Sequence, residues 1–162
     1  MSNQFKTPLH FAALQNNPKV LKYLLDSCPE PQECLKFMMA EDEQKCTPLH
    51  LACKNGSQEC IELLLEHEYV LMQHLREQAK DVINQLIKNE ILKENIFDVA
   101  HHVESDAIDL RKITDISIIM YSRDMRKWTP LHYASYNGHA KAVNFLLKRE
   151  ADQDELHLKR NT

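Results

Sequence analysis

The sequence has very little glycine, with only 2 glycines beside 6 prolines in 162 residues. Average usage would give about 11 glycines in a chain of this length. This scarcity argues against glycine-rich phosphate loops, hairpin-rich sheets and collagen-like repeats, which all need glycine at fixed positions. Hydrophobic residues make up 43% and charged residues 27% of the chain, close to the usual globular mix. A mainly helical protein with a hydrophobic core is therefore expected.

An excess of positive charge and long apolar runs are also missing. The net charge is −4, so no overall field attracts nucleic acid or an anionic membrane. No apolar stretch reaches 18 residues, and residues 1–11 lack a signal-peptide pattern. The five cysteines form no C-x-x-C pair, and their odd number favours reduced thiols over a disulfide framework or a metal site. These features predict an intracellular, cytoplasmic protein, with the nucleus as the alternative compartment, and no direct membrane insertion.

One short pattern occurs three times: residues 7–13 read TPLHFAA, residues 47–53 read TPLHLAC and residues 129–135 read TPLHYAS. Each copy is followed at the same offset by an apolar helical pattern that ends in two leucines, at residues 20–25, 60–65 and 142–147. Threonine can cap a helix through its hydroxyl, and proline suits the first helical position, where no N–H is needed. Each Thr-Pro step therefore predicts the start of a helix.

This pattern resembles the ankyrin repeat, and the resemblance implies an all-α solenoid of helix-turn-helix units joined by projecting turns called fingers. Gly56 and Gly138, with Asn16 in the same place of the first copy, stand where a left-handed residue should end the first helix of each pair. The histidines are implied to hydrogen-bond backbone and so to orient the finger and the helix start. The structural residues of the motif are Thr7, Pro8, His10, Thr47, Pro48, His50, Gly56, Thr129, Pro130, His132 and Gly138.

The spacing of the copies predicts insertions. The threonines lie 40 and 82 residues apart, against about 33 for an ankyrin unit. We expect one domain over residues 1–162, with units at about 7–40, 47–92, 95–123 and 129–161, the third being divergent. The first unit gains a short helical addition near residues 34–39. The second gains a long helical extension to about Asn89, because Glu68 stands where glycine would normally end the helix. Asn161-Thr162 falls where a further unit would begin, which predicts a longer array.

The sequence also bears on the backbone conformation in and before the fingers. Residues 116–121 (ISIIMY) predict a short extended piece before the last finger. Lys45 and Lys127 replace the glycine that is usual in an ankyrin finger, which leaves the turn geometry open.

The resemblance further implies that finger tips and the exposed side of each first helix line a concave face that recognises a protein partner. Trp128, Tyr136 and Arg126 are the nominated anchors, since such side chains are frequent binding hot spots. Packing of Trp128 on the next finger is the alternative role for that residue. The whole candidate set is Lys6, Leu14, Gln15, Glu43, Gln44, Cys46, Lys54, Asn55, Met125, Arg126, Trp128, Tyr136 and Asn137.

Signatures of catalysis are missing from the sequence. It has no H-E-x-x-H, no Walker loop and no G-x-G-x-x-G, and Cys53, three residues after His50, falls on a core position of its helix. We therefore expect no enzyme, cofactor, metal or small-molecule substrate, and a protein-protein interaction module instead. Two alternatives are a regulatory ankyrin segment of a larger enzyme, channel or effector, and partner binding through the long inserted helix.

Overall fold

Each Thr-Pro step begins a helix in the computed structural model, which describes the backbone of residues 5–91 and 117–160 and the side chains of 5–81 and 117–152. These helices are α1 (Pro8–Leu14), α4 (Pro48–Asn55) and α8 (Pro130–Tyr136). In each, the threonine N–H donates to Nδ1 of the histidine three residues on, at 3.1 to 3.2 Å. The threonine hydroxyl lies 2.7 to 2.9 Å from the same nitrogen. This local pairing fixes where the helix begins.

A left-handed residue follows each of these short helices. Asn16, Gly56 and Gly138 have φ values of 50°, 65° and 72°. The chain then turns back into a second helix: α2 (Pro18–Asp26), α5 (Gln58–Ile91) or α9 (Ala140–Arg160). The three repeated motifs thus form three helix-turn-helix pairs.

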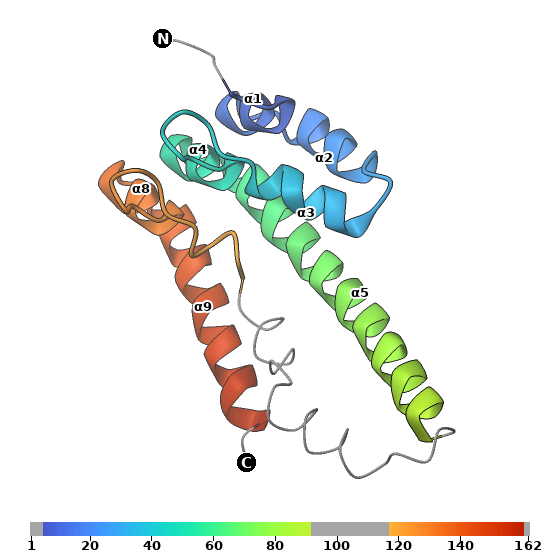
Figure 1. The fold of residues 1–162 in the computed structure, drawn as a ribbon. Helices are drawn as coiled ribbons and strands as arrows, with labels where there is room; N and C mark the ends of the chain where they lie inside the picture. The colour runs from blue at the N-terminus through green and yellow to red at the C-terminus, as the bar shows by residue number, and fades with distance from the viewer. Residues whose placement is uncertain (1–4, 92–116, 161–162) are drawn as a thin grey trace.

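The three pairs stack in one direction (Figure 1). Helix α4 lies between α1 and α8 and contacts both, while α5 contacts α2 and α9 in the second layer. Leu21, Ile61, Leu64 and Leu146 belong to the hydrophobic core and are at most 1% exposed. The described residues form helices and no strands, so the all-α repeat solenoid predicted from the sequence is confirmed.

Two segments depart from the simple pair. Helix α3 (Pro31–Met39) follows α2 and packs on α5 and α4, and its Cys34 and Met38 are each 1% exposed. Helix α5 runs for 34 residues and extends well past the stack, as Figure 1 shows in green. The sequence predicts that this extension ends at about Asn89, and the helix ends at Ile91.

The chain rejoins the stack through a buried carboxylate on α5. Glu68, 2% exposed, accepts hydrogen bonds from the hydroxyl of Ser117 and the backbone N–H of Ile119. Ile119 is fully buried. Residues 118–121 form a turn, so the prediction of an extended piece is wrong for the described part of 116–121. Ser117 Oγ also accepts from the Met120 N–H at 3.2 Å, a local bond that favours a turn over a strand.

The order of the described units follows from their contacts. Most of the divergent unit predicted at 95–123 lies outside the described residues. However, α4 contacts α8 directly, and His50 Nε2 lies 2.9 Å from the Trp128 carbonyl. A unit placed between 47–92 and 129–161 in the stack would separate α4 from α8. The second and last Thr-Pro pairs are therefore neighbours in the array.

Candidate binding surface

The two fingers are each built on one aspartate. In the first finger (residues 41–46), Asp42 Oδ1 accepts the N–H of Gln44 and Cys46 at 2.9 and 3.0 Å. In the second finger (residues 123–128), Asp124 Oδ1 accepts the N–H of Arg126 and Trp128 at 2.9 and 2.8 Å. Sequence analysis missed this role, although both aspartates stand five residues before the motif threonine, and that shared spacing was the available signal.

The lysines that replace the usual finger glycine adopt the conformation that a glycine would. Lys45 and Lys127 have φ values of 59° and 63°, and their N–H groups donate to Asp42 O and Asp124 O at 2.9 Å. The left-handed conformation costs a non-glycine residue about 1 kcal/mol or more. The bonds to the aspartate carboxylates and carbonyls hold the turns in this form.

Asp124 also connects the second finger to α8. The Tyr133 hydroxyl donates to Asp124 Oδ2 at 2.7 Å, and Arg126 Nε lies 3.6 Å from the same oxygen. Partial burial acts to raise the pKa of Asp124, but hydrogen bonds from Tyr133 and from two backbone N–H groups outweigh it and lower that pKa. The carboxylate stays ionised and fixes the finger to the helix behind it.

The fingers stack on one another as the helices do. The Met125 N–H donates to the Gln44 carbonyl at 2.9 Å. Cys46 Sγ lies 3.5 Å from the Tyr133 hydroxyl and is 2% exposed. Its prediction as an exposed finger residue is therefore wrong, because the side chain points into the junction between the two units.

An aromatic cluster stands behind the second finger. The ring of Trp128 lies 5.5 Å from that of Tyr133, 5.3 Å from Tyr136 and 6.2 Å from His132, measured between centroids. The Arg126 guanidinium lies 4.6 Å above the Trp128 ring, and its Nη2 donates to the Tyr133 hydroxyl at 2.8 Å. Trp128 is partly buried and packs against the core. Trp128 and Arg126 thus form a supporting layer within their own unit.

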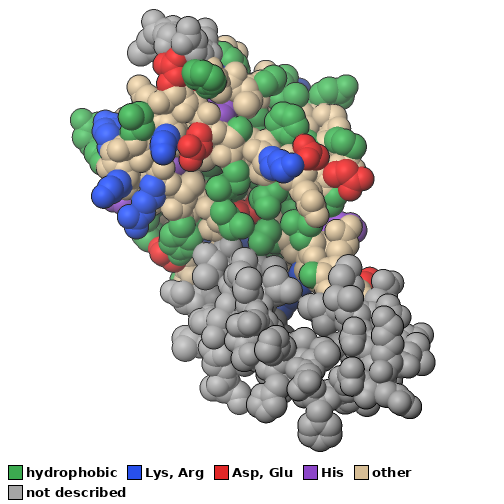
Figure 2. Space-filling model, in the orientation of Figure 1, with side chains coloured by type: hydrophobic (Ala, Val, Ile, Leu, Met, Phe, Trp, Pro, Cys, Tyr) green, Lys and Arg blue, Asp and Glu red, His purple; other side chains and the backbone are tan. Residues whose placement is uncertain are grey.

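Exposed side chains rest on this layer. Tyr136 is 78% exposed and Met125 is 67% exposed. Arg126 keeps 59% of its side chain exposed. Figure 2 shows Lys and Arg side chains gathered over α8 and the fingers, where Lys45, Arg123 and Lys127 are also exposed. An aromatic ring, a thioether and several cations therefore share one accessible region.

The other candidates divide into two groups. The amides of Asn55 and Asn137 are used within the fold, donating to the carbonyls of Leu14 and Tyr133. Lys6 forms an ion pair with Asp42 at 3.4 Å, and Leu14 is partly buried. The remaining candidates, Gln15, Glu43, Gln44 and Lys54, are exposed.

The motif histidines connect each pair to the next finger. His10 Nε2 lies 2.9 Å from Cys46 O, and His50 Nε2 lies 2.9 Å from Trp128 O. Because the threonine N–H donates to Nδ1, the neutral ring carries its proton on Nε2 and donates it to the carbonyl. His132 makes the same bond to its threonine but is exposed.

Among the described residues, the possible metal ligands are not grouped, and several thiols are buried. The described part of the chain contains no group of three or more His, Cys, Asp or Glu side chains that could hold a metal ion. Burial raises the pKa of the fully buried Cys53 thiol, and burial raises that of Cys60 to about 11. Thiols held in the protonated form are poor nucleophiles.

Among the described helices, none has both the length and the apolar character needed to cross a membrane.

The stacked helix pairs and their fingers define a helical repeat protein with an extended face. A three-copy model of ankyrin repeats matches residues 1–74, and a single ankyrin-repeat model matches residues 126–157. The chain belongs to the ankyrin-repeat family.

Two similar proteins are much longer than this chain. It is 29% identical over 143 residues to human transient receptor potential cation channel subfamily A member 1, an alignment that covers 88% of the chain and 11% of the channel. It is 31% identical over 114 residues to mouse serine/threonine-protein kinase TNNI3K, covering 67% of the chain and 12% of the kinase. The chain therefore spans only a small part of the relatives it matches.

Proposed function

We propose that this chain is a protein-interaction module that binds its partner through the fingers and the exposed side of α8. The observation that carries the proposal is the exposure of Tyr136, whose ring packs on Trp128, and of Met125, which precedes Arg126 in the same finger. A rigid, exposed aromatic ring loses little conformational entropy when it binds, so it suits a hot spot. Neither side chain fills the core, so the fold itself does not require an aromatic ring or a thioether at these exposed positions.

The proposal includes no catalytic activity, cofactor, nucleic acid or small-molecule substrate. The net charge of −4 disfavours nucleic acid, and the ankyrin repeats support a protein partner. We also propose a cytoplasmic location. The free thiols of Cys34, Cys46, Cys53 and Cys60, all buried, support it, since such thiols suit a reducing compartment.

The test is affinity capture from a lysate of the source cells with the parent chain and with Met125→Ala/Tyr136→Ala. Circular dichroism first verifies that the variant is folded. We expect the parent to retain a protein that the variant loses. The matched control is Tyr69→Ala/Val70→Ala, which removes two exposed side chains from α5, 53% and 62% exposed. Loss of capture with the α5 pair alone would contradict the proposal and would favour binding through the long helix.

A second candidate is a regulatory segment within a larger enzyme, channel or effector. The names of the two relatives, a cation channel and a protein kinase, favour it, because the similarity covers 11% and 12% of their lengths. If the captured protein is a longer form of the same polypeptide or an effector bound by it, the surface acts within such an assembly. The same Met125→Ala/Tyr136→Ala variant would then change the activity of that larger protein.

A further inference from the structure

The two fingers share a backbone design but differ in charge. Both are built on a buried aspartate, so their side chains can be matched position by position. The first finger exposes two glutamates and one lysine, whereas the second exposes two arginines and one lysine. The second finger is therefore cationic in a chain whose net charge is −4. The matched exposed side chains are Glu41 and Arg123, Glu43 and Met125, Gln44 and Arg126, and Lys45 and Lys127.

These positions are exposed because of their place within a unit. The first finger has the second finger beside it, since the Met125 N–H donates to the Gln44 carbonyl at 2.9 Å. The side chains of Gln44 and Lys45 are nevertheless exposed. Tyr136 of α8 corresponds to Lys54 of α4, which is also exposed although α8 packs on α4. Stacking of one unit on another therefore leaves the finger tips and this position of the first helix open.

The charge of the second finger is not balanced within its own stretch of sequence. In residues 123–139 the single carboxylate is that of Asp124, which is 5% exposed and accepts a hydrogen bond from the Tyr133 hydroxyl. Among the side chains that the structure describes, neither Arg123 nor Lys127 forms an ion pair. Two lysines of the neighbouring unit extend the positive charge over this region (Figure 2). We call the five cations the cationic patch: Lys45, Lys54, Arg123, Arg126 and Lys127.

One cation of the patch is held in place from behind. The Arg126 guanidinium lies 4.6 Å from the centroid of the Trp128 ring, and its Nη2 donates to the Tyr133 hydroxyl at 2.8 Å. A guanidinium has five N–H donors in a planar fork that matches a carboxylate. With 59% of the Arg126 side chain exposed, donors remain for a partner. Because the side chain is already ordered, binding a carboxylate here costs little conformational entropy.

Apolar contact area lies next to this cation. The exposed ring of Tyr136 is 5.3 Å from that of Trp128, and Met125 directly precedes Arg126 and is 67% exposed. The region therefore offers a carboxylate-binding group and an apolar surface side by side. A peptide segment that carries both acidic and apolar side chains has the matching chemistry.

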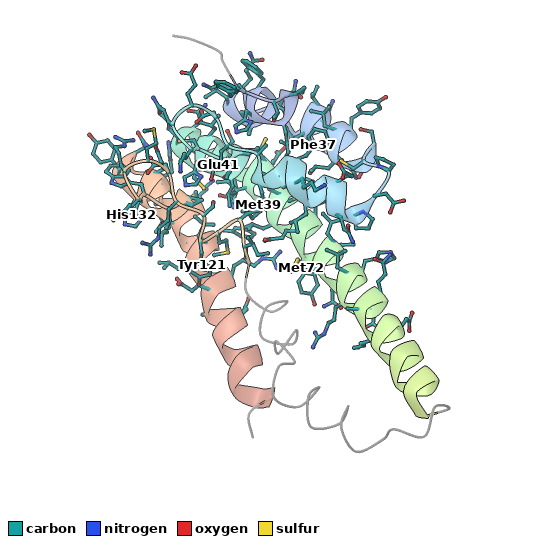
Figure 3. All side chains as sticks on the ribbon, in the orientation of Figure 1. Phe37, Met39, Glu41, Met72, Tyr121 and His132 are labelled. Carbon is teal, nitrogen blue, oxygen red and sulfur yellow. The ribbon has the colours of Figure 1, made fainter. Side chains whose placement is uncertain are left out.

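The first finger disfavours a nucleic acid in the same place. Glu41, labelled in Figure 3, and Glu43 are exposed on the finger next to the patch. A nucleic acid strand carries a negative charge at every nucleotide, so a strand that crosses both fingers meets these carboxylates. A short acidic peptide can place its charges on the second finger alone.

We propose that the cationic patch binds an acidic segment of a protein partner, with a carboxylate on Arg126 and an apolar side chain against Tyr136 and Met125. The inference rests on the proposed function and adds the chemistry of the partner. The remaining cations attract the segment over a longer range, which raises the rate of association and is screened by salt.

The experiment is a fluorescence-anisotropy titration with the full 162-residue chain. The probe is a labelled random copolymer of glutamate and tyrosine. We expect saturable binding that weakens as the salt concentration rises. A glutamine–tyrosine copolymer of the same length has the aromatic rings without the charge and should bind about tenfold more weakly or less tightly still. A single-stranded DNA oligonucleotide represents the other class of anion and should also bind more weakly than the acidic copolymer.

Two charge-reversal variants place the binding on the patch. Arg123→Glu/Lys127→Glu should weaken binding of the acidic copolymer by about tenfold or more, since it removes two attractions and adds two repulsions. The matched control Lys19→Glu/Lys22→Glu makes the same charge change at exposed positions of α2 and should leave the affinity within about threefold of the parent. Urea unfolding verifies that both variants are as stable as the parent.

Several outcomes overturn the proposal: a parent chain that does not bind the acidic copolymer, equal binding of the glutamine copolymer or of DNA, or an equal loss in the α2 control. Lysate capture separates this inference from the proposed function. A protein that is lost by Met125→Ala/Tyr136→Ala but kept by Arg123→Glu/Lys127→Glu would leave the interaction module in place and would overturn only the acidic chemistry of its partner.

Discussion

Glu68 and Ile119 are joined by a hydrogen bond of 3.0 Å across 51 positions of sequence. The carboxylate of Glu68 also accepts a hydrogen bond from the Ser117 hydroxyl. In the same segment, the Tyr121 hydroxyl donates to Glu150 of α9 at 3.0 Å, and Figure 3 labels the side chain of Tyr121. Burial raises the pKa of Glu68, although the bonds from Ser117 and Ile119 act to lower it. This buried group sets the point at which the chain re-enters the array.

Replacing Glu68 should therefore destabilise the protein. Glu68→Ala leaves the Ile119 N–H and the Ser117 hydroxyl without this acceptor, at an expected cost of about 2 to 4 kcal/mol of unfolding free energy. Glu68→Gln keeps one carbonyl oxygen and should cost less than about 1 kcal/mol, since the buried charge is also removed. Urea unfolding followed by circular dichroism measures both. The exposed neighbour Glu66→Ala is the control, and an equal effect of the two alanine variants would contradict this role.

The motif histidines should differ in their contribution to stability according to what covers them. His50→Ala removes a buried ring and its bond to the Trp128 carbonyl, which should cost about 2 to 4 kcal/mol. His132→Ala makes the same change in the motif at an exposed position and should cost about 1 kcal/mol or less. Thermal unfolding at neutral pH compares the two in one measurement. Equal losses would show that only the local cap to the threonine matters.

Acidification should weaken the fold through His10 and His50. Burial lowers the pKa of each ring below the ordinary 6.5, so the unfolded chain takes up these protons first. The stabilisation from the neutral rings is present above pH 6.5 and is lost as the pH falls from there through the lowered folded-state pKa values. The melting temperature should therefore drop as the pH falls below about 6.5. His10→Gln/His50→Gln should flatten this dependence, whereas His132→Gln should preserve it.

The two glycines should not be equally replaceable. Alanine at either position pays for a left-handed backbone, which costs about 1 kcal/mol. Gly56→Ala also places its Cβ 2.5 Å from the His139 ring, and such overpacking adds about 1 to 3 kcal/mol. Gly138→Ala should thus be the milder change in urea unfolding. A Gly138→Ala loss as large as that of Gly56→Ala would contradict this difference.

The repeated local pattern was sufficient to predict the helix pairs. Thr-Pro steps, histidines and left-handed residues act within a few positions, so their consequences can be worked out from sequence. The residues nominated on the second finger do lie together, because Asp124 and Tyr133 gather Arg126 and Trp128 at one place.

Long-range relations were the ones that sequence reasoning missed. Glu68 was recognised as a residue that fails to stop a helix, but its partner Ser117 is 49 positions away and shares no motif with it. The direct contact of α4 with α8 was missed because the 82 residues between Thr47 and Thr129 suggested that another unit lies between them. Cys46 was assigned to the surface because a finger is usually exposed, whereas Tyr133 of the next pair covers it.

The unequal spacing of the three pairs has a consequence for the order in which the array assembles. At the first junction, His10 and its carbonyl partner are 36 positions apart, whereas at the second junction His50 and its partner are 78 apart. Each doubling of a closed loop adds only about 0.6 kcal/mol of chain entropy, so the long excursion between Thr47 and Thr129 is thermodynamically cheap. Contacts of longer range still form more slowly. We therefore expect the first two pairs to form before the third pair docks on them.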